Sequence, residues 1–141
     1  MYNDDWMRER GFLDQDVVTA GDLVNAHENK PLVTVFAEEL VSHAIGKMRK
    51  FGISQIPVLK DNQFVGSVDD STIYQALLDK PELSDLPISS IMGPVFPVVK
   101  NGTSVEELCK LINKSTPAVL VEKTDGSHHI VTRYDIISAM S

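Results

Sequence analysis

An approximate internal duplication constrains this chain more than any other feature of its sequence. Val41 and Val105 begin two similar apolar helical patterns and lie 64 residues apart, as do Ala44 and Leu108. Further along, Val68 and Val131 are separated by 63 residues. A recurrence at this period indicates two copies of one supersecondary unit. With 141 residues in all, the chain is expected to form two small halves that share a core.

Turn and capping signals divide each copy into a strand, a helix, two strands and a second helix. β-branched residues favour the strands, apolar residues at helical spacing favour the helices, and Gly, Pro and Asp-Asn pairs mark the turns. In the first copy these patterns predict a short helix capped by Thr19, a strand over Leu32–Phe36, a helix from Leu40 that Gly52 ends, strands over Gln55–Leu59 and Phe64–Val68, and a helix over Ser71–Asp79. In the second copy they predict a short helix over Ile88–Met92, a strand over Phe96–Val99, a helix over Val105–Ile112, strands over Ala118–Glu122 and His129–Thr132, and a closing helix over Asp135–Met140. The expected fold class is α/β.

Charge and composition narrow the classes of partner. The chain has 13 Lys and Arg against 20 Asp and Glu, and a net charge of −7 disfavours nucleic acid and anionic lipid. Cys109 is the only cysteine, which leaves no internal disulfide or cysteine-based zinc site and fits a reducing compartment. The N-terminus lacks the pattern of a secretion signal, and the longest nearly apolar run, Ile91–Val99, is far shorter than the roughly 20 residues that span a bilayer. We expect a soluble, cytoplasmic protein without a membrane partner.

Three motifs carry a family resemblance. The chain resembles the tandem CBS-domain pair over about Val18 to Met140. The matching motifs are Gly52–Val58 and Val65–Val68 in the first copy and Ile130–Ile137 in the second. The resemblance implies two tandem CBS-type β-α-β-β-α repeats packed with pseudo-twofold symmetry. It also implies a connector over residues 1–17, a first repeat over 18–80 and a second over 81–141.

The N-terminal segment adds a narrower resemblance. Asn3–Leu13 resembles the connection that follows the pyridoxal-phosphate domain of cystathionine β-synthase, in which a CBS pair forms the C-terminal regulatory part. This implies an attached or associated pyridoxal-phosphate catalytic domain and no catalytic residues in the chain itself. Alternatively, Trp6, Met7, Phe12 and Leu13 only pack an N-terminal helix on the core.

Thr132 and Asp135 form the sharpest candidate site. A Thr at the end of a strand, three residues before an Asp in the first turn of a helix, places a hydroxyl and free backbone N–H groups beside a carboxylate. This combination suits a nucleoside that bears a phosphate or carboxylate. By resemblance, Thr132 would hold that anionic group and Asp135 the ribose, while Arg133 could answer a phosphate. The alternative is that Asp135 only caps the helix.

The resemblance also supplies the rest of the ligand site. It places the adenine between apolar residues of the first copy, with backbone groups near Gln55 at its edge. The full set of expected ligand-binding residues is Pro31, Leu32, Val33, Ile53, Gln55, Ile56, Pro57, Ile130, Thr132, Arg133 and Asp135. Two residues depart from the family pattern: Ile53 stands where animal enzymes that bind S-adenosylmethionine carry Phe, and His129 stands where Gly is usual.

The equivalent pair in the first copy has its residue types exchanged. Asp69 stands at the position of Thr132 and Thr72 at that of Asp135. Asp69 would repel an anionic group, and Thr72 offers a weaker acceptor for a ribose than a carboxylate does. The second copy is also shortened at Ser115–Pro117. We therefore predict one working site and one defective site.

The remaining reactive residues have structural interpretations. His128 and His129 have no third metal ligand at a suitable spacing, so a solvated turn is expected and no metal site. Cys109 lies on the apolar face of its predicted helix and is interpreted as a core residue rather than a nucleophile. Glu106 and Glu107 are expected to be exposed.

These observations favour a regulatory module that binds an adenosine derivative in one cleft. The analogy to cystathionine β-synthase favours S-adenosylmethionine as the regulatory ligand, with AMP, ADP or ATP as the alternative. A module of a different class remains open, namely a ligand-free dimerisation or autoinhibitory unit. We also expect a homodimer, formed through apolar helix faces that one chain covers incompletely, such as Leu40, Ala44 and Met48 or Leu108 and Ile112.

Overall fold

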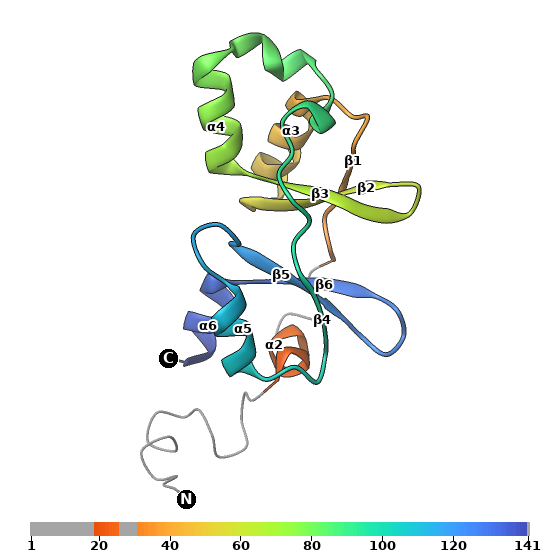
Figure 1. Ribbon diagram of the computed structural model, residues 1–141, viewed down its shortest axis with the longest axis vertical. Helices are drawn as coiled ribbons and strands as arrows, with labels where there is room; N and C mark the ends of the chain where they lie inside the picture. The colour runs from red at the N-terminus through yellow and green to blue at the C-terminus, as the bar shows by residue number, and fades with distance from the viewer. Residues whose placement is uncertain (1–18, 26–30, 141) are drawn as a thin grey trace, which may run out of the picture. The chain divides into compact units, whose positions relative to one another are not determined.

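The computed structural model describes residues 19–25 and 31–140, and the chain divides into two compact units (Figure 1). Val33–Phe96 form one, which we call the repeat 1 unit. The other combines Met1–Leu32 with Pro97–Ser141, and we call it the repeat 2 unit.

The repeat 1 unit is a three-stranded sheet with helices. Its elements are β1 (Val35–Phe36), α3 (Val41–Phe51), β2 (Gln55–Lys60), β3 (Gln63–Asp69), α4 (Asp70–Asp79) and the 3₁₀ turns η1 (Pro81–Asp85) and η2 (Ile88–Ser90). β2 is central, parallel to β1 and antiparallel to β3. The buried core draws on the sheet, α3, α4 and η2.

Local chemistry explains how these elements end. Gly52 is left-handed (φ 64°) and its N–H donates to Met48 O, which confirms the predicted end of α3. Asp61 and Asn62 both have positive φ, 53° and 62°, and form a two-residue hairpin turn between β2 and β3.

The segment after η2 closes the edge of β3. Ser67 and Gly93 exchange backbone hydrogen bonds of 3.1 and 2.8 Å, and the Ser67 hydroxyl donates to Pro94 O at 2.7 Å. Gly66 permits this approach, since a Cβ there would lie 2.6 Å from Met92 Sδ. Repeat 1 therefore completes its sheet and core with residues that precede β4.

The repeat 2 unit has the same order of elements. It contains α2 (Ala20–Asn25), β4 (Val98–Lys100), α5 (Val105–Leu111), β5 (Ala118–Glu122), β6 (His128–Thr132) and α6 (Arg133–Met140). β5 is parallel to β4 and antiparallel to β6. Val119 pairs with Val131 as Ile56 pairs with Val68, so the 63-residue offset holds in both hairpins up to the register shift of the first hairpin between Val58 and Leu59. The predicted α/β repeats are confirmed.

α2 packs in this unit although it precedes β1 in the chain. It contacts β5, β6 and α6, and Leu23 and Val24 are buried in the same core as Val131. Thr19 caps it as predicted: the Thr19 hydroxyl accepts from Asp22 N at 3.2 Å, and the Asp22 carboxylate accepts from Thr19 N at 3.1 Å.

Several local predictions were wrong in detail. The strand predicted over Leu32–Phe36 is confined to Val35–Phe36, because only these residues pair with β2. The predicted strand over Phe96–Val99 is observed at Val98–Lys100.

No helix among the described residues combines the length and the apolar character needed to cross a membrane.

Three side-chain predictions were also wrong. Cys109 is exposed rather than in the core, because the buried stripe of α5 passes through its neighbour Leu108. His128 and His129 lie in β6 and are half-buried, rather than in a solvated turn. Ala44, Leu108 and Ile112 are buried within the chain, so these residues are not available for a dimer contact. Glu106 and Glu107 are exposed as predicted.

Candidate functional site

The junction of β6 and α6 brings Thr132 and Asp135 into contact. β6 ends at Thr132, α6 begins at Arg133, and Asp135 is the third residue of the helix. One carboxylate oxygen, Asp135 Oδ2, accepts from Thr132 N at 2.8 Å and from Thr132 Oγ1 at 3.2 Å. Both residues are half-buried, whereas Arg133 is exposed. The strand end and helix start thus bring a hydroxyl and a carboxylate into hydrogen-bonding contact.

This arrangement shows that Asp135 has the capping role considered as the alternative to ligand binding. An acid in the first helical turn is stabilised by the positive end of the helix dipole, and its bond to Thr132 N satisfies a backbone donor. The same groups can act on a ligand, since a carboxylate accepts from vicinal hydroxyls and Thr and Arg donate to an anion. A ligand that used Asp135 and Thr132 would replace the hydrogen bond between their side chains.

The other predicted site residues are divided between the two units. The repeat 2 unit contains Pro31, which is exposed, and Leu32 and Ile130, which are half-buried. In the repeat 1 unit Val33, Ile53 and Gln55 are half-buried, and Ile56 and Pro57 are buried. Contact between any of these residues and a ligand remains a prediction.

The junction of β3 and α4 is the counterpart in repeat 1. Asp69 is the N-cap of α4, and Asp69 Oδ1 accepts from Thr72 N at 2.7 Å and from Ser71 Oγ at 3.3 Å. Both junctions thus place a carboxylate at the first turn of the helix: it belongs to the N-cap residue Asp69 in repeat 1 and to Asp135, the third helical residue, in repeat 2. The predicted difference in ligand binding between the copies stays a prediction.

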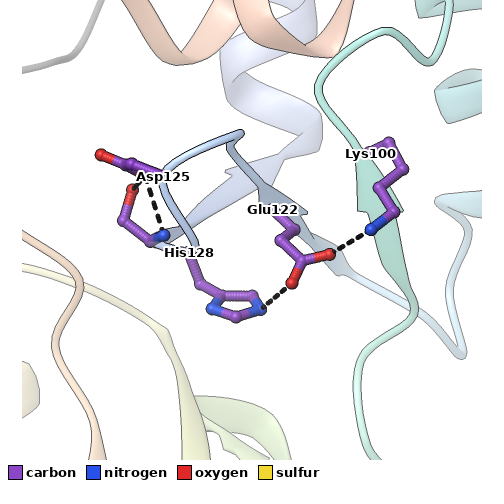
Figure 2. A network of polar contacts seen from close by, with 5 residues as sticks. Lys100, Glu122, Asp125 and His128 are labelled. Carbon is purple, nitrogen blue, oxygen red and sulfur yellow. Dashed lines mark hydrogen bonds and ion pairs between the residues drawn. The ribbon is translucent and has the colours of Figure 1, made fainter.

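A polar rung across the second sheet was not found by the sequence analysis (Figure 2). Lys100 of β4 pairs in register with Glu122 of β5, and Glu122 pairs with His128 of β6. Lys100 Nζ lies 2.6 Å from Glu122 Oε1, and His128 Nε2 lies 3.8 Å from Glu122 Oε2. The hydrogen bond and positive charge of Lys100 lower the pKa of Glu122. Strand register, which places residues far apart in sequence on one line, was the missing information.

The hairpin loop beyond this rung is held by its own side chains. Asp125 Oδ1 accepts from the hydroxyl and the N–H of Ser127, at 2.6 and 2.9 Å. These bonds lower the pKa of the Asp125 carboxyl. Across residues 19–25 and 31–140, no group of three or more His, Cys, Asp or Glu side chains is placed to hold a metal ion.

The CBS-domain family matches residues 20–79 and again residues 88–141. The chain belongs to the CBS-domain family. It is a tandem CBS pair of the regulatory kind, as the resemblance implied, and each CBS repeat supplies one of the two three-stranded sheets.

Solved structures support the same fold. A CBS-domain-containing protein from Agrobacterium tumefaciens matches with a TM-score of 0.80 at 16% identity, covering 92% of this chain and 98% of its own. CBSX2, a CBS-pair protein from Arabidopsis thaliana, matches with a TM-score of 0.67 at 24% identity, covering 87% of this chain and 94% of its own. CBSX2 has also been solved in complex with AMP; that structure has a TM-score of 0.64 at 24% identity and covers 86% and 94% of the two chains.

Nothing in these matches is specific to cystathionine β-synthase. The residues that carry that resemblance, Asn3–Leu13, lie outside the described residues. The alternative, in which Trp6 and Phe12 pack an N-terminal helix on the core, concerns the same segment and stays a prediction as well. The fold and the regulatory class therefore rest on the two CBS repeats alone.

Proposed function

We propose that this CBS pair binds an adenosine-type ligand at the Thr132–Asp135 junction and regulates a protein to which it is attached or with which it associates. The observation that carries the proposal is the meeting of the Thr132 hydroxyl and the Asp135 carboxylate at the start of α6. The likeness in fold to CBSX2, which has been solved with AMP, supports this class of ligand.

Each side chain has a separate role in this proposal. Asp135 accepts from the two ribose hydroxyls, because a carboxylate can accept two donors at once. Thr132 donates to the phosphate or carboxylate of the ligand, and the positive end of the α6 dipole favours the same anionic group. Arg133, exposed beside them, adds a charge-assisted contact when the group is a phosphate.

Different observations support different adenosine derivatives as the ligand. AMP has the support of CBSX2, whereas S-adenosylmethionine rests on the resemblance of Asn3–Leu13 to the connector of cystathionine β-synthase. The net charge of −7 disfavours ATP, the most highly charged candidate. Under the S-adenosylmethionine alternative, the regulated partner is a pyridoxal-phosphate catalytic domain.

Calorimetric titration of the full chain tests the site directly. AMP, ADP, ATP and S-adenosylmethionine are titrated in turn, and Asp135→Ala is expected to weaken the preferred ligand at least tenfold, about 1.4 kcal/mol. Asp69→Ala is the matched control, since it removes a carboxylate from the equivalent junction of repeat 1 and should leave that affinity unchanged. Equal affinity in wild type and Asp135→Ala would exclude this site.

The adenine-contacting residues need their own variants. Ile53→Phe restores the aromatic residue found in the animal enzymes and is expected to tighten S-adenosylmethionine more than AMP, because it adds a stacking surface. Unchanged affinity for both ligands would remove Ile53 from the proposed site.

A second candidate function, self-association, is favoured by the outer face of α4. Tyr74 and Leu78 lie one helical turn apart and are both 62% exposed, which is high for large apolar side chains. A twofold contact through this face would cover the same patch on both subunits. Light scattering should then show a homodimer that Leu78→Lys dissociates, whereas a monomeric wild type at tens of micromolar would contradict this function.

A further inference from the structure

Helix α2 belongs to the unit that contains the proposed site, although it lies at the other end of the sequence. The family match to repeat 1 begins at Ala20, the first residue of α2. Nevertheless Leu23 and Val24 are buried in the core of the repeat 2 unit together with Ile136 of α6. α2 also contacts α6 directly, as well as β5 and β6. The helix is therefore a structural neighbour of the Thr132–Asp135 junction.

The docking of α2 leaves little room for adjustment. Ala20 N donates to Thr103 O at 2.7 Å, and Gly21 N donates to Asn101 O at 2.8 Å. A Cβ on Gly21 would lie 3.0 Å from Asn101 O, which is tighter than ordinary packing. The first turn of α2 is thus fixed to the turn between β4 and α5, so a displacement of α6 acts on a helix that is already tightly held.

Asp135 controls the start of the helix against which α2 packs. Its bonds to Thr132 hold the first turn of α6, and the next residue, Ile136, is buried in the core shared with α2. A ligand that takes over Asp135 and Thr132 changes which groups hold this turn. The packing of Ile136 then differs between the occupied and empty states, and such a difference is what couples a site to a second element.

We infer that α2 is coupled to the state of the Thr132–Asp135 junction through its packing against α6. Its N-terminal end continues from residues 1–18, and its C-terminal end leads through residues 26–32 to the repeat 1 unit. The inference rests on the proposed function for the identity of the ligand. The coupling of α6 to α2 does not depend on it and can be measured without any ligand.

Hydrogen exchange of the full chain, followed by mass spectrometry, tests this coupling. Asp135→Ala removes the bonds that hold the first turn of α6 and should speed amide exchange in both α6 and α2 by roughly fivefold, the usual effect of losing a helix cap. Exchange in β2, β3 and α4, which belong to the repeat 1 unit, should stay as in the wild type.

Two variants control for loss of stability. Asp69→Ala removes the cap of α4 and should speed exchange in α4 alone. Asn113→Ala removes the bonds from Ser115 N and Thr116 N to Asn113 Oδ1, 2.8 and 3.0 Å, and so loosens the turn between α5 and β5 within the same unit as α2. If Asn113→Ala speeds exchange in α2 as much as Asp135→Ala does, the effect is general loosening and the inference is overturned.

The reverse direction and the ligand complete the test. Gly21→Ala, which crowds Asn101, should speed exchange in the first turn of α6, because coupling is reciprocal. With AMP as the probe, α2 should exchange more slowly in the wild type and not in Asp135→Ala. Unchanged exchange of α2 in Asp135→Ala would overturn the inference whether or not AMP binds. Failure of AMP to bind, together with faster α2 exchange in Asp135→Ala, would instead count against the proposed ligand and support the coupling.

Discussion

The two CBS repeats share one strand order, but their hairpins differ in register at one point and their residue types differ at several positions outside the core. The pairing of β2 with β3 shifts between Val58 and Leu59, whereas the pairing of β5 with β6 is continuous. One rung of paired residues crosses each sheet, and it is apolar in repeat 1 but polar in repeat 2. In the first sheet it consists of Phe36, Leu59 and Phe64. In the second sheet it consists of Lys100, Glu122 and His128. At the last strand-to-helix junction, Asp69 of repeat 1 is replaced by Thr132 in repeat 2.

The comparison distinguishes positions that the fold requires to be apolar from positions that can carry the polar residues of a ligand site. Positions that pair in the centre of both hairpins remain apolar, such as Ile56 with Val68 and Val119 with Val131, because they are buried in both cores. The rungs and helix starts are less constrained by packing, so their residue types can diverge between the copies. A ligand site can then be present in one repeat and absent from the other within the same architecture.

The largest expected effect concerns core volume. Leu108 of α5 and Ala44 of α3 occupy equivalent positions 64 residues apart, and both are fully buried. Leu108→Ala gives repeat 2 the smaller residue of repeat 1 and should lower the free energy of unfolding by about 2–5 kcal/mol, because a cavity remains. Urea unfolding measures this. The control Leu86→Ala, at a leucine that is 41% exposed, should cost less than about 0.5 kcal/mol. Similar losses in both variants would show that the core around Leu108 collapses to fill the space.

The next effect concerns the position occupied by Gly66 in repeat 1 and His129 in repeat 2. A Cβ at Gly66 would lie 2.6 Å from Met92 Sδ and 2.9 Å from Gly93 O. Gly66→Ala should therefore destabilise the repeat 1 unit by roughly 1–3 kcal/mol, as overpacking does. Gly46→Ala is the matched control: its Cβ meets nothing within 4 Å, and as a helical position it should gain about 0.5–1 kcal/mol. A neutral Gly66→Ala in thermal unfolding would mean that the segment after η2 moves aside freely.

A double exchange sharpens the comparison of the two junctions and rests on the proposed function. Asp69→Thr with Thr72→Asp gives repeat 1 the residue order of repeat 2. We expect wild type to bind one AMP per chain and the double variant to bind a second, with a gain of at least tenfold in affinity at the new site, about 1.4 kcal/mol. Thr72→Asp alone is the control and should add no site, because Asp69 still repels the anion. Calorimetric stoichiometry decides, and two equal sites in the wild type would show that the asymmetry has been misread.

The smallest effect concerns the polar rung. Lys100→Ala should raise the pKa of Glu122 toward its usual range, because it removes the hydrogen bond and charge that lower that pKa. A lowered carboxyl pKa contributes stability above the unfolded-state pKa and loses it as pH falls through the folded-state pKa. The wild type should therefore lose a small stabilisation on acidification that Lys100→Ala lacks. NMR titration of Glu122 measures the shift, and Lys60→Ala, in repeat 1, should leave it unmoved.

The sequence predicted most elements because their causes are local. Gly52 ends α3, Asp61 and Asn62 form the turn, and Thr19 caps α2, each through chemistry within a few residues. Side-chain burial was less predictable. Cys109 follows a fully buried leucine, and periodicity alone did not place the edge of the buried stripe finely enough to separate the two.

Long-range relations could not be obtained from periodicity. The rung of Lys100, Glu122 and His128 depends on strand register, and the packing of α2 against β5, β6 and α6 depends on tertiary structure. At the candidate site, the spacing of Thr132 and Asp135 predicts that the two residues are close. It does not predict that both hydrogen bonds from Thr132 go to one carboxylate oxygen, because this depends on how the Asp135 side chain is oriented.

The placement of α2 also bears on how the chain folds during synthesis. The repeat 1 unit, Val33–Phe96, is continuous, so its core can close once Phe96 has left the ribosome. α2 is made earlier, but its core partners Val131 and Ile136 are translated only after the whole repeat 1 unit. Leu23 and Val24 therefore lack part of their native core until β6 and α6 have been made, and the repeat 2 unit closes a loop that contains the entire repeat 1 unit.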